Sequence, residues 1–302
     1  MPSILFDNVY YFNYYGNGDI FVAKEFVKAM MAIIPTKKFW YAHAKTPRLL
    51  EDIDNLYHTN IVPERMENTW RCQAYDNSLY INTWIGLESS DVLPGIGVTV
   101  ENYYRMFNRM LMKLNMKLGT KWFLPGPPTN YIPTTDFSKI AKEGIQCVGQ
   151  FILEHQIDDM ILISNGEVQS AQAENFDFTP LIEQVSKDYP DKVFILTSPS
   201  PFRAPNVFYT SDFIKTVDGV DLNEIGYLST FCRVIVGRNS SPYVFCLLKE
   251  NMQDASKAFV AFNYSFPGAI FVQTPMPCGR LWTNSSDNNK RLAILKEILD
   301  AG

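Results

Sequence analysis

The feature that most constrains this chain is an alternation of strand-like and helix-like segments, in two series that a proline-rich stretch separates. In the first series, strands are predicted at 3–12, 38–43 and 79–85, and helices at 20–34, 48–57 and 100–118. In the second, strands are predicted at 160–164, 193–197, 206–210, 234–236 and 257–264, and helices at 179–188, 222–231 and 290–299. Such alternation is typical of α/β folds built on parallel sheets.

The proline-rich stretch has four prolines within residues 123–133, a density that predicts an extended connector. With 302 residues, the chain is long enough for two domains. We expect an N-terminal domain at 1–156, with the connector 123–135 inside it, and a C-terminal domain at 157–302. Two Rossmann-like domains of this kind would face one another across a cleft at the carboxyl ends of their strands.

The chain is moderately acidic, with a net charge of −5 and a pI near 5.3. This charge disfavours a nucleic-acid backbone as the main partner. Five cysteines are scattered without C-x-x-C spacing, which is typical of buried thiols in a reducing compartment. Neither a basic, apolar leader nor an apolar run of about 18 residues is present. We therefore expect a cytoplasmic protein that binds no nucleic acid, spans no membrane and holds no metal.

One segment, 234–245, reads VIVGRNSSPYVF and combines a buried strand, a glycine turn, two hydroxyls and a helix start. Backbone N–H groups at a helix N-terminus favour an anion, so the segment predicts a phosphate-binding site. An ordinary strand-to-helix turn in which Ser240 and Ser241 cap the helix is the alternative. Arg238 either pairs with phosphate in bidentate fashion or is a solvated charge.

The turn Gly16-Asn17-Gly18-Asp19 follows the first predicted strand. Its glycines permit close approach of a ligand to the backbone. Asp19 is placed either as a first-turn residue of the next helix or as a general base at the end of the strand. The dinucleotide fingerprint G-x-G-x-x-G is incomplete, because Phe21 occupies the third glycine position.

The turn after strand 160–164 is the corresponding first loop of the second domain. It is an ordinary turn, or it contacts a diphosphate or sugar through Asn165 and the backbone of Gly166. Asp212 follows strand 206–210 and either caps a loop or contacts a ribose or base edge.

Other catalytic patterns are missing from the sequence, including G-x-S-x-G, the P-loop and H-E-x-x-H. The three histidines, His43, His58 and His155, are far apart along the chain. One D-x-D pattern occurs at Asp52 and Asp54, within the helix predicted at 48–57. We expect its carboxylates to lie on the solvated face of that helix.

With these residues in view, the chain resembles two-domain GT-B glycosyltransferases, and among them the bacterial heptosyltransferase-like group. That group has a first-strand turn ending in G-D before a helix, here Gly18-Asp19. Its second domain has D-S-G-P-x-H-x-A after a hydrophobic strand, where this chain has NSSPYVF at 239–245. Asn239 stands in place of the aspartate and Val244 in place of the histidine, so a heptose donor is not implied.

The resemblance implies an acceptor-binding N-terminal domain at 1–156 and a nucleotide-sugar-binding C-terminal domain at 157–302. It also implies that Asp19 is the base and that Ser240 and Ser241 hold the phosphates of the donor. The residues expected at the donor are Gly18, Asn165, Gly166, Asp212, Arg238, Asn239, Ser240 and Ser241. The implied reaction transfers a sugar from a nucleotide-sugar donor to the hydroxyl of a glycan or glycolipid-type acceptor, with inversion and without a metal or cofactor.

Tyrosines cluster beside the N-terminal turn, at positions 10, 11, 14 and 15. They form either a stacking platform for the acceptor or part of the core. Two further functions remain open at this point. One is a Rossmann methyltransferase or dehydrogenase, and the other is a non-catalytic sugar-binding or scaffold protein with a GT-B-like fold.

Overall fold

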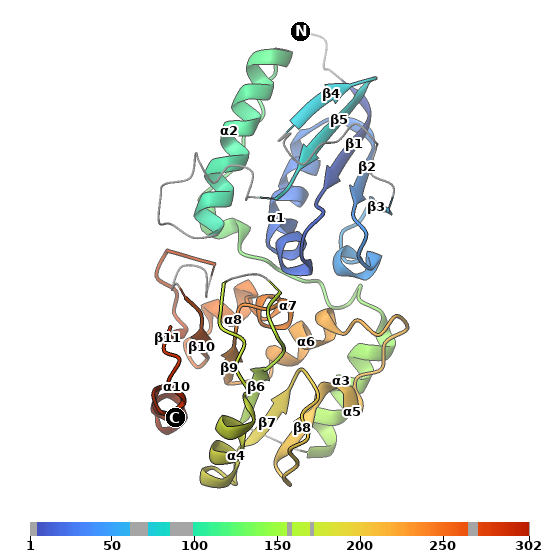
Figure 1. Cartoon of the computed structure of the whole chain (residues 1–302). Coiled ribbons are helices and arrows are strands. Elements are labelled where there is room, and N and C mark those ends of the chain that lie inside the picture. The colour runs from blue at the N-terminus through green and yellow to red at the C-terminus, as the bar shows by residue number, and fades with distance from the viewer. Residues whose placement is uncertain are drawn as a thin grey trace. The chain divides into compact units, whose positions relative to one another are not determined.

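The computed structural model describes residues 5–60, 72–84, 99–155, 159–169, 172–264 and 271–301. The chain divides into two compact units, Met1–Pro133 and Thr134–Gly302, drawn in blue to green and green to red in Figure 1. The division lies inside the proline-rich connector. Helix α3 (Lys142–His155), which we expected in the first domain, belongs to the second unit because it packs on α5 (Thr210–Phe213) and α6 (Leu222–Ser229).

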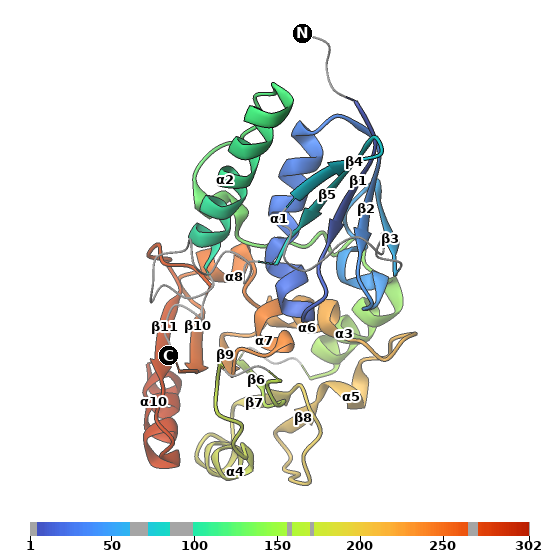
Figure 2. The same cartoon turned by 45° about the horizontal axis from the view of Figure 1, so that its top comes forward.

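The first unit is built on a five-stranded sheet in the order β3-β2-β1-β5-β4. Its strands are β1 (Phe6–Phe12), β2 (Thr36–Ala42), β3 (Leu56–Thr59), β4 (Cys72–Tyr75) and β5 (Ser78–Asn82). The helices among its described residues are α1 (Asn17–Ile33), η1 (Pro47–Leu50), α2 (Val100–Leu118) and η3 (Pro128–Tyr131). Figures 1 and 2 both show α2 alongside α1 on one side of this sheet.

Two features of this sheet differ from the sequence prediction. The helix predicted at 48–57 is wrong, because its first part is the short 3-10 turn η1 and its last part is the start of strand β3. Strand β4 pairs antiparallel with β5, whereas the other pairs are parallel. The two strands meet in a tight hairpin at Asp76 and Asn77, whose left-handed φ angles of 46° and 53° suit these two residue types.

The second unit is built on a six-stranded sheet whose described pairs are all parallel, in the order β11-β10-β9-β6-β7-β8. Its strands are β6 (Met160–Ser164), β7 (Val193–Leu196), β8 (Val207–Tyr209), β9 (Val234–Gly237), β10 (Ala258–Phe262) and β11 (Gly279–Thr283). In chain order this is the Rossmann arrangement 3-2-1-4-5-6. The strand order therefore reverses between β6 and β9, at the point where such sheets bind ligands.

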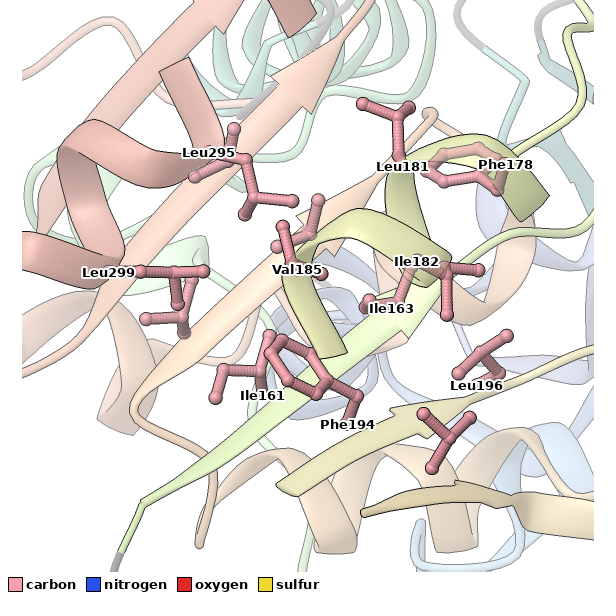
Figure 3. Packing of buried hydrophobic residues seen from close by; sticks show 14 of the residues in the cluster. Ile161, Ile163, Phe178, Leu181, Ile182, Val185, Phe194, Leu196, Leu295 and Leu299 are labelled. Atoms are coloured by element: carbon pink, nitrogen blue, oxygen red, sulfur yellow. The ribbon is translucent and has the colours of Figure 1, made fainter. Parts of the chain in front are cut away.

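The core of the second unit follows from the alternation of side chains along its strands. Ile161 and Ile163 on β6 and Phe194 and Leu196 on β7 point to one face of the sheet (Figure 3). Helices α4 (Thr179–Asp188) and α10 (Asn288–Asp300) cover this face with Leu181, Ile182, Val185, Leu295 and Leu299. Within the described residues, the remaining helices of this unit are α7 (Ser241–Phe245) and α8 (Lys249–Gln253).

Within the described ranges, no helix combines the length and apolar character needed to cross a membrane.

Candidate functional site

The reversal point of the second sheet joins the ends of β6 and β9 very closely. Ser164 and Gly237 are paired in register, and a Cβ on Gly237 would lie 2.7 Å from the Ser164 Cβ and 2.8 Å from its carbonyl oxygen. Glycine is needed here because the two strands approach closely, and not because of a left-handed backbone, since the φ angle of Gly237 is not positive. The hydroxyls of Ser164 and Ser240 then meet at 2.9 Å.

The loop between β9 and α7 is fixed through its backbone. The Asn239 N–H donates to Asn263 Oδ1 at 2.9 Å, and the Asn239 carbonyl accepts from Gln172 Nε2 at 2.5 Å. Ser240 occupies the N-cap of α7 without a side-chain capping bond, so the expected capping role of the serines is not observed. In the described part of the chain, the N–H groups of Ser241 and Tyr243 have no hydrogen-bond acceptor. Two N–H donors are thus available where the sequence predicts a phosphate-binding site.

Helix α7 is short. It ends at Phe245, and Leu247 and Leu248 lead into the separate helix α8. Val244, which stands where the resembled group has histidine, is 3% exposed and packs inward. The Val244 side chain therefore belongs to the core.

Asn165 and Gly166 join the loops that follow β6 and β7. Asn165 Nδ2 donates to the Ser198 carbonyl, and the Ser198 N–H donates to Asn165 Oδ1, both at 2.9 Å. A Cβ on Gly166 would lie 2.8 Å from Ser198 Oγ. The amide of Asn165 is therefore committed to its neighbouring loop, and Gly166 keeps the two loops close.

Arg238 is buried, at 1% exposure, so the prediction of a solvated charge is wrong. All five guanidinium N–H groups donate to backbone carbonyls of the loop after β6, at 2.6–3.4 Å. The acceptors are the carbonyl oxygens of Asn165, Gly166, Glu174 and Phe176. In this arrangement the guanidinium has no N–H left for a bidentate phosphate contact. Arg238 holds the loop in place from inside.

Aromatic rings and a second arginine complete this support. The Arg238 guanidinium lies 5.1 Å from the Phe176 ring centroid and 4.9 Å from that of Phe178. Arg291 on α10 lies 3.5 Å from the Phe176 centroid and bonds Glu174 at 2.6 Å. The loop after β6 is thus bound both to the end of β9 and to the last helix of the chain.

Asp212 lies apart from this cluster. It is an exposed residue in the short helix α5, which follows the edge strand β8. Three strand spacings separate β8 from β9, a distance of about 14 Å. The structure therefore brings Ser164, Asn165, Gly166, Arg238 and Ser240 together at the reversal point and leaves Asp212 at the edge of the sheet.

The first unit has its own reversal point, between β1 and β5, and Asp19 follows β1 there. Asp19 is the third residue of α1, and its Oδ2 accepts the Gly16 N–H at 3.1 Å, which confirms the first-turn position. The pKa of Asp19 is raised, because burial raises it by more than the hydrogen bonds from the backbone N–H groups of Gly16 and Asp19 lower it. Gly18 lies in the same helical turn. A half-buried carboxylate with a raised pKa suits proton transfer.

A buried pair of hydroxyls, those of Tyr41 and Thr83, lies within electrostatic range of this carboxylate. Thr83, just after β5, donates its backbone N–H to the Phe12 carbonyl at 3.0 Å, and its hydroxyl lies 2.6 Å from the Tyr41 hydroxyl. Burial raises the pKa of Tyr41, and the charge of Asp19 raises it further. Tyr41 is therefore a neutral phenol within electrostatic range of Asp19. Sequence analysis missed this group because Tyr41 and Thr83 are 42 residues apart.

A histidine pair lies at the same edge of the sheet, although the sequence suggested that the histidines are separate. The rings of His43 and His58 are 4.5 Å apart because β2 and β3 are parallel neighbours. His43 Nδ1 accepts the Lys45 N–H at 3.1 Å, which places the ring hydrogen on Nε2. Burial, followed by the charge of His58, lowers the pKa of His43 to about 4. His43 is therefore neutral at physiological pH.

Only one carboxylate of the D-x-D pattern is solvated as predicted, because Asp54 is exposed and Asp52 is not. Asp52 is 4% exposed and pairs with the buried Lys24 of α1 at 2.7 Å. Lys28 lies 3.7 Å from its other oxygen. Asp52 thus neutralises a buried lysine and fixes the turn after η1 on α1. No group of three or more His, Cys, Asp or Glu side chains suited to a metal occurs among the residues described.

The tyrosines near the N-terminal turn divide between the two expected roles. Tyr11 is fully buried, and Tyr10 stacks between Trp40 and Tyr80 on the sheet. Tyr14 and Tyr15 remain 38% and 36% exposed at the end of β1. Tyr15 stacks on Trp84 with the ring centroids 3.6 Å apart. Tyr14 and Tyr15 are thus partly exposed in the segment between β1 and α1, the helix that carries Asp19.

Comparison with known proteins places this geometry in a fold family. No family model matches the chain, and no curated protein sequence matches it. Among solved structures, a glycosyl transferase family 9 protein from Veillonella parvula DSM 2008 aligns over 96% of this chain and 91% of its own, with 10% identity and a TM-score of 0.52. E. coli heptosyltransferase WaaC with ADP aligns over 98% of this chain and 100% of its own, with 9% identity and a TM-score of 0.51. This chain has the GT-B fold.

The same transferase with ADP-2-deoxy-2-fluoro heptose gives a TM-score of 0.50, at 9% identity over 97% of this chain and 99% of its own. At such identities the likeness establishes the GT-B fold alone.

Proposed function

We propose that this protein is a glycosyltransferase that moves a sugar from a nucleotide-sugar donor to an acceptor hydroxyl. The observation that carries the proposal is the reversal point between β6 and β9, where two hydroxyls and two N–H donors without acceptors in the described chain lie together. Solved structures of the same fold include a heptosyltransferase with ADP and with an ADP-sugar analogue. The proposed ligand of this point is the diphosphate of the donor.

The donor seat consists mainly of neutral groups. The N–H groups of Ser241 and Tyr243 and the hydroxyls of Ser164 and Ser240 bind the diphosphate oxygens in this proposal. Asn165, Gly166 and Asn239 shape the seat, and Arg238 holds its loop. As the bond between the anomeric carbon and the diphosphate breaks, the N–H donors stabilise the charge that develops on the leaving oxygen.

Asp19 is the proposed base. Its carboxylate accepts the proton of the acceptor hydroxyl while the hydroxyl oxygen forms a bond to the anomeric carbon, and the nucleoside diphosphate leaves from the opposite side. One displacement of this kind inverts the anomeric configuration without a metal. The raised pKa of Asp19 makes it a stronger proton acceptor than a solvated aspartate.

The proposed acceptor is a glycan or glycolipid-type hydroxyl compound. The exposed faces of Tyr14 and Tyr15, with Trp84, provide a stacking surface for a sugar ring near Asp19. Since Val244 is buried and Asn239 is fixed through its backbone, the proposal does not extend to a heptose donor.

The test is release of nucleoside diphosphate from a panel of nucleotide-sugars, each with a mixture of glycans and glycolipids. Asp19→Asn keeps an oxygen for the Gly16 N–H but removes the base, so turnover should fall by at least about a hundredfold while donor affinity stays within about threefold. Asp7→Asn is the matched control, because Asp7 lies at the other end of β1 and pairs with Lys37 on the surface. Full turnover by Asp19→Asn, or binding of S-adenosyl compounds in place of nucleotides, contradicts the proposal.

A further inference from the structure

A long stretch of this acidic chain holds no acidic residue at all. Between Glu101 and Asp136 the sequence contains neither Asp nor Glu, although the chain as a whole has a net charge of −5. Five basic residues occur in this stretch at every fourth position: Arg105, Arg109, Lys113, Lys117 and Lys121. The first four belong to α2, and the fifth lies just beyond its C-cap, Gly119.

The spacing places these cations along one side of the helix. Four residues of an α-helix advance by about 40° beyond a full turn, so the row winds slowly around α2. All five side chains are exposed. The buried stripe of α2 is apolar and includes Tyr103, Phe107, Met110 and Leu114. Because this stripe is buried and the cations are exposed, the basic row lies on the outer face of α2.

Large apolar side chains are exposed on the same face. Met112 and Met116 are 54% and 74% exposed, and helical spacing places both within about 40° of Arg105 around the axis. Phe123, shortly after the helix, is 67% exposed. Cations alone would suit any polyanion, whereas cations interspersed with exposed methionine and phenylalanine suit the boundary between lipid headgroups and acyl chains.

We propose that the outer face of α2 docks this protein on a membrane surface rich in anionic lipids. The guanidinium and ammonium groups bind lipid phosphates, and Met112, Met116 and Phe123 enter the region beneath the headgroups. The charge complementarity is local, since the acidic remainder of the chain is repelled by such a surface and orients α2 toward it. This inference does not depend on the proposed transferase activity.

The test is sedimentation of the full chain with phosphatidylcholine vesicles that contain or lack phosphatidylglycerol. Wild type should sediment with the anionic vesicles alone, and less as salt rises. Replacing Arg105, Arg109, Lys113 and Lys117 together by Gln should weaken binding by at least about a hundredfold. A matched variant with the same charge change replaces exposed lysines of the second unit by Gln, at Lys142, Lys187, Lys215 and Lys290, and should bind as wild type.

A second variant, Met112→Gln with Met116→Gln, separates a lipid surface from another polyanion. It should weaken vesicle binding by about tenfold, because apolar insertion is lost while the charge is kept. Absence of wild-type binding to anionic vesicles overturns the proposal, as does equal loss in the matched lysine variant. If the methionine variant binds as wild type and duplex DNA competes with the vesicles, the face binds polyanions in general and the membrane assignment is overturned.

Discussion

Arg238 offers a sharp test of how the donor loop is held. Arg238→Met removes the guanidinium but keeps an unbranched side chain of similar path in the same buried space. The five N–H contacts to the loop after β6 disappear, and four carbonyl oxygens lose their donor. Arg238→Lys keeps the charge, but its three N–H donors are all on one nitrogen. That nitrogen cannot reach all four carbonyl oxygens that the planar guanidinium binds.

The expected loss in the free energy of unfolding follows from the number and burial of these hydrogen bonds. A hydrogen bond to a charged group contributes about 1.5–3 kcal/mol, but the loop can turn part of its carbonyls to water once the guanidinium is gone. We therefore expect Arg238→Met to lower the free energy of unfolding of the second unit by about 3–5 kcal/mol, the range for breaking a buried charged network. For a unit of this size that is a fall in Tm of roughly 10 °C. Arg238→Lys should cost about 2 kcal/mol, since some of the bonds remain.

The assay is urea unfolding combined with hydrogen exchange read at the peptide level. Exchange should accelerate in residues 165–169 and 172–176 more than in strands β6 and β9. Arg203→Met is the matched control, because Arg203 also donates to loop carbonyls, those of Ser200 and Phe202, but is exposed. It should cost less than about 0.5 kcal/mol. A loss below about 1 kcal/mol in Arg238→Met, or an equal loss in the control, would refute the supporting role of Arg238.

Three further outcomes are expected. Because burial raises the pKa of Asp19, the acid limb of a kcat–pH profile should lie above the ordinary aspartate value of 3.8 and disappear in the residual activity of Asp19→Asn. Burial lowers the pKa of Lys24 from 10.5 to about 8. Between pH 8 and pH 10.5, Lys24 is therefore protonated in the unfolded chain and largely deprotonated in the folded chain. The free energy of unfolding of wild type relative to Lys24→Met should therefore rise from pH 8 to pH 10.5, in urea titrations across that range. In thermal unfolding, Gly237→Ala should lower the free energy of unfolding by about 1–3 kcal/mol, because the new Cβ clashes with Ser164. Gly149→Ala should stabilise α3 by about 0.5–1 kcal/mol, because a Cβ there meets nothing within 4 Å.

Much of the architecture could be predicted because its elements have strong local patterns. The continuous apolar run at Val234–Gly237 and the long amphipathic α2 correspond closely to their predicted ranges. The alternation of elements also predicts parallel pairing, which both sheets show in every described pair except that of β4 with β5. Strand β3 was missed because Leu49, Ile53 and Leu56 have helical spacing, while its place is set by pairing with β2.

The candidate site could be predicted less well, because its groups come together only through the sheets. His43 and His58 are neighbours through the pairing of β2 and β3, and no local spacing indicates that contact. Arg238 looked like a phosphate ligand or a solvated charge, whereas five distant carbonyl contacts determine its role. A polar residue after a buried strand indicates the location of a site, but its partners decide what it does.

The central claim is that the reversal point between β6 and β9 binds a nucleoside diphosphate. Hydrogen exchange of the wild-type chain with and without ADP, UDP or GDP tests it most directly. Binding should slow exchange at residues 237–243, where the N–H groups of Ser241 and Tyr243 lack acceptors in the described chain, and in the adjoining loop at 164–169. Protection by none of the three nucleotides, or protection confined to the first unit, would contradict the claim.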